Sequence, residues 1–175
     1  MFGEKGLIHI YTGDGKGKTT SALGLAFRAL GHGASVCVIQ FMKGWDSYGE
    51  LKSALKHDRL KIIQTGRPDY VYRGKELPED YSEALRGMEA AKRAVKEDMY
   101  DMLILDEINV AISYGLVTLS AVIDLIREKP HEMEIVLTGR EAHEELITVA
   151  DLVTEMREIK HPFTLGTAAR KGVEF

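Results

Sequence analysis

The chain has 175 residues, 45% of them hydrophobic, so it is long enough to bury a core and short enough for a single domain over residues 1–175. No segment is apolar enough to cross a bilayer, which argues against a membrane protein. The net charge is −4 and no block of Lys and Arg occurs. We therefore expect no nucleic-acid partner, because such binding depends on neutralising phosphates.

Hydrophobic periodicity and the positions of Gly and Pro predict an alternation of strands and helices. In chain order these are a strand at 6–13, a helix at 18–31, strands at 35–41 and 60–65, a helix at 78–98, a strand at 101–107, a helix at 118–130, a strand at 134–140, a helix at 141–150 and a strand at 152–159. Most of the strands are apolar throughout, a pattern typical of a parallel sheet with helices on both faces. In such a sheet, ligands bind at the carboxyl ends of the strands.

Two of the predicted helices have an apolar face at helical spacing. The helix at 78–98 begins at Pro78 and has acidic residues in its first turn, which the helix dipole favours. Its predicted buried face consists of Tyr81, Ala84, Leu85, Met88, Ala91 and Val95. The face predicted for the helix at 18–31 consists of Ala22, Ala26, Ala29 and Leu30. The loops at 43–50 and 66–78 and the tail from residue 160 lack such periodicity.

The only cysteine, Cys37, lies in an apolar run, so we expect a buried core residue and no disulfide within the chain. The first residues contain no basic region followed by a long apolar run, unlike a secretory signal. These features predict a cytoplasmic protein.

The stretch YTGDGKGKTT, residues 11–20, is one residue short of the phosphate-binding pattern G-x-x-x-x-G-K-[ST], whose first glycine would fall on Thr12. A phosphate site needs glycines, which let backbone N–H groups approach an anion, and a helix N-terminus behind them. The stretch supplies turns, a charge and a hydroxyl for Mg²⁺ through Gly13, Gly15, Gly17, Lys18 and Thr19. Lys16 and Lys18 lie at a helix start, where the dipole disfavours cations, so an anionic ligand explains them better than a plain glycine-rich turn.

A second motif is MLILDE, residues 102–107, in which a buried strand ends in Asp106 and Glu107. This is the Walker-B form, which brings a carboxylate beside the phosphates to hold Mg²⁺. The two motifs predict a three-layer α/β fold of the RecA-like P-loop NTPase type. From the residues alone an ATPase or kinase is favoured, although no arginine finger or base for a substrate hydroxyl is evident. A nucleotide-switched binding module without catalysis also stays open.

Five segments, in this order and spacing, resemble the P-loop type of ATP:cob(I)alamin (corrinoid) adenosyltransferase. They are YTGDGKGKTT, QFMKGWDSYGE, LDEI, LTGR and the tail KHPF with KGVEF. The resemblance covers nearly the whole chain. It implies a shortened loop that binds ATP in the opposite sense from ordinary P-loop enzymes. It also implies that cobalt(I) of a reduced corrinoid attacks the 5′ carbon of the ribose and that tripolyphosphate leaves. This nucleophile carries no proton, so no general base is needed.

The same resemblance implies roles for individual residues. Lys18, Thr19 and Glu107 would be catalytic, and Thr19, Asp106 and Glu107 would serve the Mg²⁺. The ATP-binding residues would be Gly13, Asp14, Gly15, Lys16, Gly17, Lys18, Thr19, Thr20, Arg28, Glu50 and Arg140. Plain surface positions for Arg28 and Arg140 stay open as alternatives. The resemblance further implies a homodimer and an electron donor such as a flavoprotein reductase.

Toward the corrinoid, the resemblance implies Trp45, Tyr70, Tyr72, His161 and Phe163, within a site over which the tail from Lys160 closes. The sequence departs from the family in two places. Asp14 stands where Asn is common, next to the expected phosphates. In family members the loop after Gly66 continues with aromatics that help displace the corrinoid's lower ligand, whereas this chain has RPD at 67–69. Either Tyr70 or Tyr72 takes over that function, which is our hypothesis, or the lower ligand is handled differently.

Overall fold

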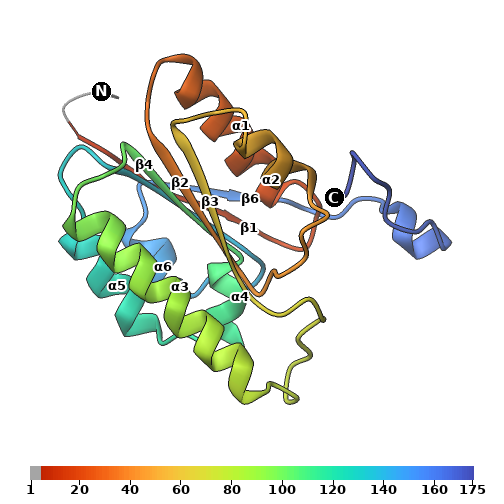
Figure 1. The fold of residues 1–175 in the computed structure, drawn as a ribbon. Coiled ribbons are helices and arrows are strands. Elements are labelled where there is room, and N and C mark those ends of the chain that lie inside the picture. The colour runs from red at the N-terminus through yellow and green to blue at the C-terminus, as the bar shows by residue number, and fades with distance from the viewer. Residues whose placement is uncertain (1–4) are drawn as a thin grey trace.

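The computed structural model describes residues 5–175, in which six parallel strands form one sheet of order β3-β2-β4-β5-β1-β6 (Figure 1). The strands are β1 Ile8–Thr12, β2 Val36–Phe41, β3 Leu60–Thr65, β4 Met102–Asp106, β5 Glu134–Thr138 and β6 Leu152–Glu155. Each lies within a segment predicted as a strand. Because all six run in the same direction, their carboxyl ends meet at one edge of the sheet, as expected for a ligand site in an open α/β fold.

Helices cover both faces of this sheet, which confirms the predicted three-layer α/β fold (Figure 1). One face carries α1 Lys18–Gly31 and α2 Gly49–Ala54, and the other carries α3 Pro78–Lys96, α4 Ile108–Ser113, α5 Leu119–Glu128 and α6 Glu144–Val149. A short 3₁₀ helix, Pro162–Leu165, lies in the tail. Within residues 5–175, no helix is both long and apolar enough to span a membrane.

The face of α1 that packs on the sheet consists of small residues. Ala22, Ala26 and Ala29 are buried there against apolar residues of the central strands, as predicted, and Leu30 is partly buried at their side. Alanines at this spacing bring the helix close to the sheet. They also fix where its first turn lies, directly after the glycine-rich loop.

The predicted face of α3 is wrong at two positions. Tyr81 and Leu85 are 46% and 61% exposed, while the smaller Gly87 and Ala94 are buried instead. The reason is close packing: a Cβ atom on Gly87 would come within 2.6 Å of the Phe41 ring. The helix therefore places Gly87 and Ala94 on its buried face beside Met88 and Val95, whereas Tyr81 and Leu85 lie outside that contact.

Candidate functional site

A cavity of about 660 Å³ opens at the carboxyl edge of the sheet. It lies between the glycine-rich loop, the start of α2, the ends of β4 and β5, and the C-terminal tail. The structure brings together here most of the residues predicted for ATP, namely Asp14, Gly15, Lys16, Gly17, Lys18, Thr19, Thr20, Glu50 and Arg140, together with Glu107, which was predicted for Mg²⁺. Two far-separated motifs of the sequence thus line one cavity.

The glycines of the loop at 13–17 are required by its packing. Gly13 and Gly17 have φ of 91° and 127°, a region that favours glycine. The N–H of Gly15 donates to the carbonyl of Met156, 2.6 Å away, and a Cβ atom on Gly13 or Gly15 would come within 2.6 to 2.7 Å of that same oxygen. The loop therefore rests directly on the chain that follows β6, with no room for side chains.

Lys18 lies inside the loop rather than in solvent. Its ammonium donates to the carbonyls of Gly13 and Gly15, both at 2.7 Å, and burial lowers its pKa. Asp14 lines the same cavity, with its side chain 82% exposed and 3.8 Å from Arg140.

Asp106 is the centre of a buried polar network. One of its carboxylate oxygens accepts from the hydroxyls of Thr19 and Thr138, at 2.8 and 2.7 Å, and the other accepts from Lys43 at 2.7 Å. Burial by itself would raise the pKa of this carboxyl, but Lys43 and the two hydroxyls hold it below its usual value. Thr138 also accepts from the N–H of Glu107 at 3.0 Å, so the end of β5 connects the end of β4 to the start of α1.

Glu107 lies at the mouth of this network, facing the cavity. Its backbone has a φ of 62°, and it precedes the first residue of α4. Burial and the neighbouring Asp106 carboxylate raise its pKa. The hydroxyl of Thr19 and the two carboxylates form a set of oxygen donors of the kind that Mg²⁺ prefers, and Mg²⁺ is commonly held by one or two carboxylates together with substrate phosphates. The residues therefore fit such an ion.

The C-terminal tail reaches back to the glycine-rich loop (Figure 1). Lys16 donates to the carboxylate of Glu174 at 2.9 Å and to the carbonyl of Val173 at 3.0 Å. Hydrogen bonds from Arg170 and Lys16 lower the pKa of Glu174 to about 2. His161 lines the cavity, and its ring nitrogen accepts from the N–H of Phe163. One predicted phosphate ligand, Lys16, is thus bound by the chain itself.

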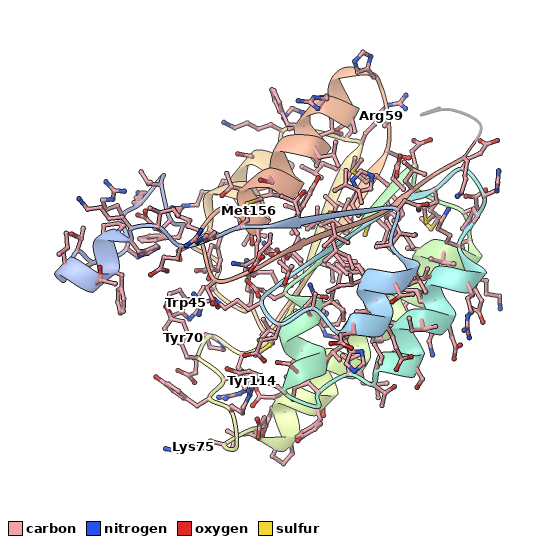
Figure 2. All side chains as sticks on the ribbon, turned by 180° about the vertical axis from the view of Figure 1, so that it is seen from behind. Trp45, Arg59, Tyr70, Lys75, Tyr114 and Met156 are labelled. Carbon is pink, nitrogen blue, oxygen red and sulfur yellow. The ribbon has the colours of Figure 1, made fainter. Side chains whose placement is uncertain are left out.

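A row of aromatic side chains leads out of the cavity. Tyr48 lines it, the Trp45 ring stacks on Tyr48 with centroids 6.3 Å apart, and Tyr70 meets Trp45 edge-on at 5.5 Å. Figure 2 shows Trp45 and Tyr70 beside each other, although they come from two different loops. The loop after β3 therefore continues the wall that starts at the cavity.

Arg67 and Arg73 attach that loop to the rest of the fold. Arg67 contacts the buried carboxylate of Asp80 at 2.7 Å, in the first turn of α3. Arg73 pairs with Glu141 and lies 4.9 Å from the centre of the Tyr114 ring. The arginine at position 67 is thus a structural residue, and the exposed aromatic residues of the loop are tyrosines 70 and 72.

Seven predicted residues are not part of the cavity lining, namely Gly13, Arg28, Trp45, Tyr70, Tyr72, Asp106 and Phe163. Arg28 is exposed in the last turn of α1, Tyr72 is exposed on the loop, and Phe163 is 74% exposed on the tail. Conversely, sequence reasoning did not single out Lys43 and Thr138, which both contact Asp106. Both stand in quoted segments, QFMKG and LTGR, but nothing in a single sequence pairs them with Asp106.

Comparison with known proteins decides the family. Residues 4–175 match the family model described as ATP:corrinoid adenosyltransferase BtuR/CobO/CobP. The chain belongs to this family. It is 42% identical over 175 residues to a corrinoid adenosyltransferase of Sinorhizobium sp, covering 98% of this chain and 81% of that relative. It is 35% identical over 173 residues to the corrinoid adenosyltransferase of Escherichia coli K12, covering 98% of this chain and 87% of the relative.

A solved structure of low sequence identity supports the fold. The flagellar accessory protein FlaH from Methanocaldococcus jannaschii matches with a TM-score of 0.60 at 20% identity, covering 87% of this chain and 71% of FlaH. At this identity the likeness concerns the fold alone. It agrees with the predicted P-loop NTPase architecture, whereas the family model distinguishes the chain from ordinary phosphoryl-transfer enzymes.

Proposed function

We propose that the chain transfers the 5′-deoxyadenosyl group of ATP to the cobalt(I) of a reduced corrinoid and releases tripolyphosphate, in adenosylcobalamin synthesis or corrinoid salvage. Family membership gives the reaction class. The observation that carries the assignment of the site is the cavity that unites the glycine-rich loop, Glu107 and Arg140 with an aromatic wall. A phosphate-binding end beside an apolar, aromatic end suits a reaction between ATP and a large flat ligand.

In the proposed reaction the cobalt(I) electron pair forms the Co–C bond to the 5′ carbon. The C–O bond to the triphosphate breaks, its electron pair stays on the leaving oxygen, and cobalt becomes formally cobalt(III). No proton moves, so the chain needs no base. Its task is to stabilise the charge that develops on the leaving group, through Lys18, Lys16 and the loop N–H groups, and to hold the two reactants in line.

We assign Thr19, Asp106 and Glu107 to Mg²⁺. This rests on the set of oxygen donors at the mouth of the Asp106 network. When bound, Mg²⁺ acts as a Lewis acid that neutralises charge on the leaving tripolyphosphate. The hydroxyl of Thr19 is already oriented, because it donates to the buried Asp106 carboxylate. The remaining ATP contacts are assigned to the loop residues, Glu50 and Arg140, and Arg28 stays a prediction.

Product analysis tests this function. Anaerobic incubation with Mg-ATP and chemically reduced cobalamin should yield light-sensitive adenosylcobalamin and intact tripolyphosphate in equal amounts, and chelation of Mg²⁺ should lower both. A control without corrinoid should release neither ADP nor phosphate. Formation of ADP and phosphate with unchanged corrinoid would instead indicate chemistry at phosphorus, and a kinase or ATPase would replace the proposed function.

For the corrinoid, we assign the wall formed by Trp45 and Tyr70 to one face of the ring, and His161 and the tail, which line the cavity, to further contacts. Changing Tyr70 and Tyr72 together to Ala should raise the KM for the corrinoid, because the wall loses its outer aromatic surface, while the KM for ATP stays the same. Steady-state kinetics with each substrate varied in turn measures both. Tyr81→Ala, an exposed tyrosine of α3, is the matched control. Unchanged corrinoid affinity in the double variant would exclude the tyrosines from the site.

The family resemblance also supports three broader proposals. We propose that the chain acts as a single domain, forms a homodimer and works in the cytoplasm. An electron donor such as a flavoprotein reductase would supply cobalt(I). The net charge of −4 supports the absence of a nucleic-acid partner.

A further inference from the structure

Lys43 is a charged residue in an unusual place. Its side chain is 15% exposed, and its ammonium lies 2.7 Å from one oxygen of Asp106 and 3.5 Å from the hydroxyl of Thr19. It therefore touches two of the three residues assigned to the cation. It also lines the cavity, so the same ammonium faces the space assigned to the triphosphate.

The backbone is built to hold Lys43 there. Met42, the residue before it, has a φ of 59°, a left-handed conformation that is unfavourable for a residue other than glycine. A Cβ atom on Gly66 would collide with the backbone of Met42 and Lys43, so the neighbouring loop packs tightly behind this turn. The turn at the end of β2 thus directs Lys43 back over the sheet edge instead of into solvent.

The negative charge of Asp106 explains why Lys43 lies in this buried position. A buried carboxylate is costly unless it is paired and hydrogen-bonded, and Lys43 is the cation that pairs with Asp106 in the structure. Burial by itself would lower the pKa of Lys43, but the Asp106 and Glu107 carboxylates hold it above its usual value. A divalent cation at the same oxygens would perform the same neutralisation, and two cations cannot share so small a site without strong repulsion.

We propose that Lys43 stands in for the divalent cation on Asp106 while no nucleotide is bound, and is displaced when the cation arrives with ATP. Displacement leaves the ammonium free within the same cavity, where the leaving tripolyphosphate is the strongest anion. The protein thereby binds its cation weakly on its own and firmly only together with ATP. This inference rests on the proposed cation site.

Binding of Mn²⁺ without nucleotide tests the idea, with free Mn²⁺ counted by electron paramagnetic resonance. Lys43→Met should bind Mn²⁺ about tenfold more tightly than the unchanged protein, a typical size for coupling between two ligands of one site. Turnover by the same variant should fall, because the leaving group loses a cation. Damage to the fold would lower both the Mn²⁺ affinity and the turnover. A higher Mn²⁺ affinity together with a lower turnover therefore identifies the proposed function of Lys43.

Three further variants make the test specific. Lys43→Arg keeps the charge and should bind Mn²⁺ like the unchanged protein. Lys16→Met removes an equal charge from the same cavity at a residue that binds Glu174 and not Asp106. It should increase the affinity for Mn²⁺ much less than Lys43→Met does. Lys43→Gln keeps a hydrogen-bond donor, and serves if Lys43→Met fails to fold. An equal effect of Lys16→Met, or unchanged Mn²⁺ affinity in both neutral variants at position 43, would overturn the inference.

The experiment separates this inference from the proposed function. If the unchanged protein binds Mn²⁺ in the presence of ATP while substitution of Lys43 changes nothing, the cation site stands and only the inference about Lys43 falls. If Mn²⁺ does not bind even with ATP, the assignment of Thr19, Asp106 and Glu107 to the cation is wrong, and the inference falls with it.

Discussion

Lys18→Ala should lower kcat for adenosyl transfer by about 10²–10³-fold, the usual cost of removing one group that stabilises developing charge in a transition state. The ammonium lies at the centre of the glycine-rich loop, between the carbonyls of Gly13 and Gly15. In the proposed reaction it faces the leaving tripolyphosphate, so its charge counts most when the C–O bond breaks. The rate of adenosylcobalamin formation at saturating Mg-ATP measures the effect.

Lys92→Ala provides the matched control, because this lysine is exposed on α3, on the opposite face of the sheet from α1. It should keep the full rate. Circular dichroism and thermal unfolding should show that Lys18→Ala retains the fold, since α1 and its alanine face are untouched. A well-folded Lys18→Ala protein with a near-normal rate would remove the glycine-rich loop from the mechanism.

Much of the fold is predictable from this sequence because the signals are local. The run VCVIQF is apolar at every position except Gln40, and all six of its residues are buried in the sheet. The helices α2 and α4 were not predicted from the sequence, and each has only six residues, fewer than two turns. The helix α6 is equally short, but it lies within the longer segment at 141–150 that was predicted as a helix. The helix α4 also follows a left-handed residue, Glu107, which no helix-start rule anticipates.

The error in α3 has a different cause. Apolar periodicity placed Tyr81 and Leu85 on the buried face of α3. In the structure both are exposed, and Gly87 and Ala94 are buried instead. Asp80, which the sequence presents as one of several acids in the first turn, is instead buried against Arg67. Packing distances and ion pairs between loops are tertiary properties, and periodicity contains no information on them.

Some residues of the site are likewise predictable from local motifs, and others are not. Lys18, Thr19 and Glu107 come from motifs whose spacing is itself the signal, and all three line one cavity. Lys43 and Thr138 escaped prediction because their partner Asp106 is 63 and 32 residues away in the chain. Lys43 follows β2 and Thr138 ends β5, so both reach Asp106 at the end of β4 only because these three strands are neighbours in the sheet.

Asp106→Ala should be the most disruptive single change at the site. It leaves Lys43 as a largely buried charge without a partner and removes the acceptor of two hydroxyls. Breaking a buried ion pair from one side typically costs about 3 kcal/mol or more in the free energy of unfolding. Urea denaturation, followed by circular dichroism, should show this loss, and adenosyl transfer should fall below detection because the cation loses its support.

The combination of Asp106→Ala with Lys43→Met separates charge from packing. Removing both partners of a buried pair is often close to neutral, whereas removing one is costly. The double variant should therefore be more stable than Asp106→Ala alone, which gives a coupling energy from the four proteins of the cycle. It should remain inactive, because Thr19 and Glu107 alone do not replace Asp106. Strictly additive losses of stability would show that Lys43 and Asp106 do not interact in solution, which would contradict both the network and the inference drawn from it.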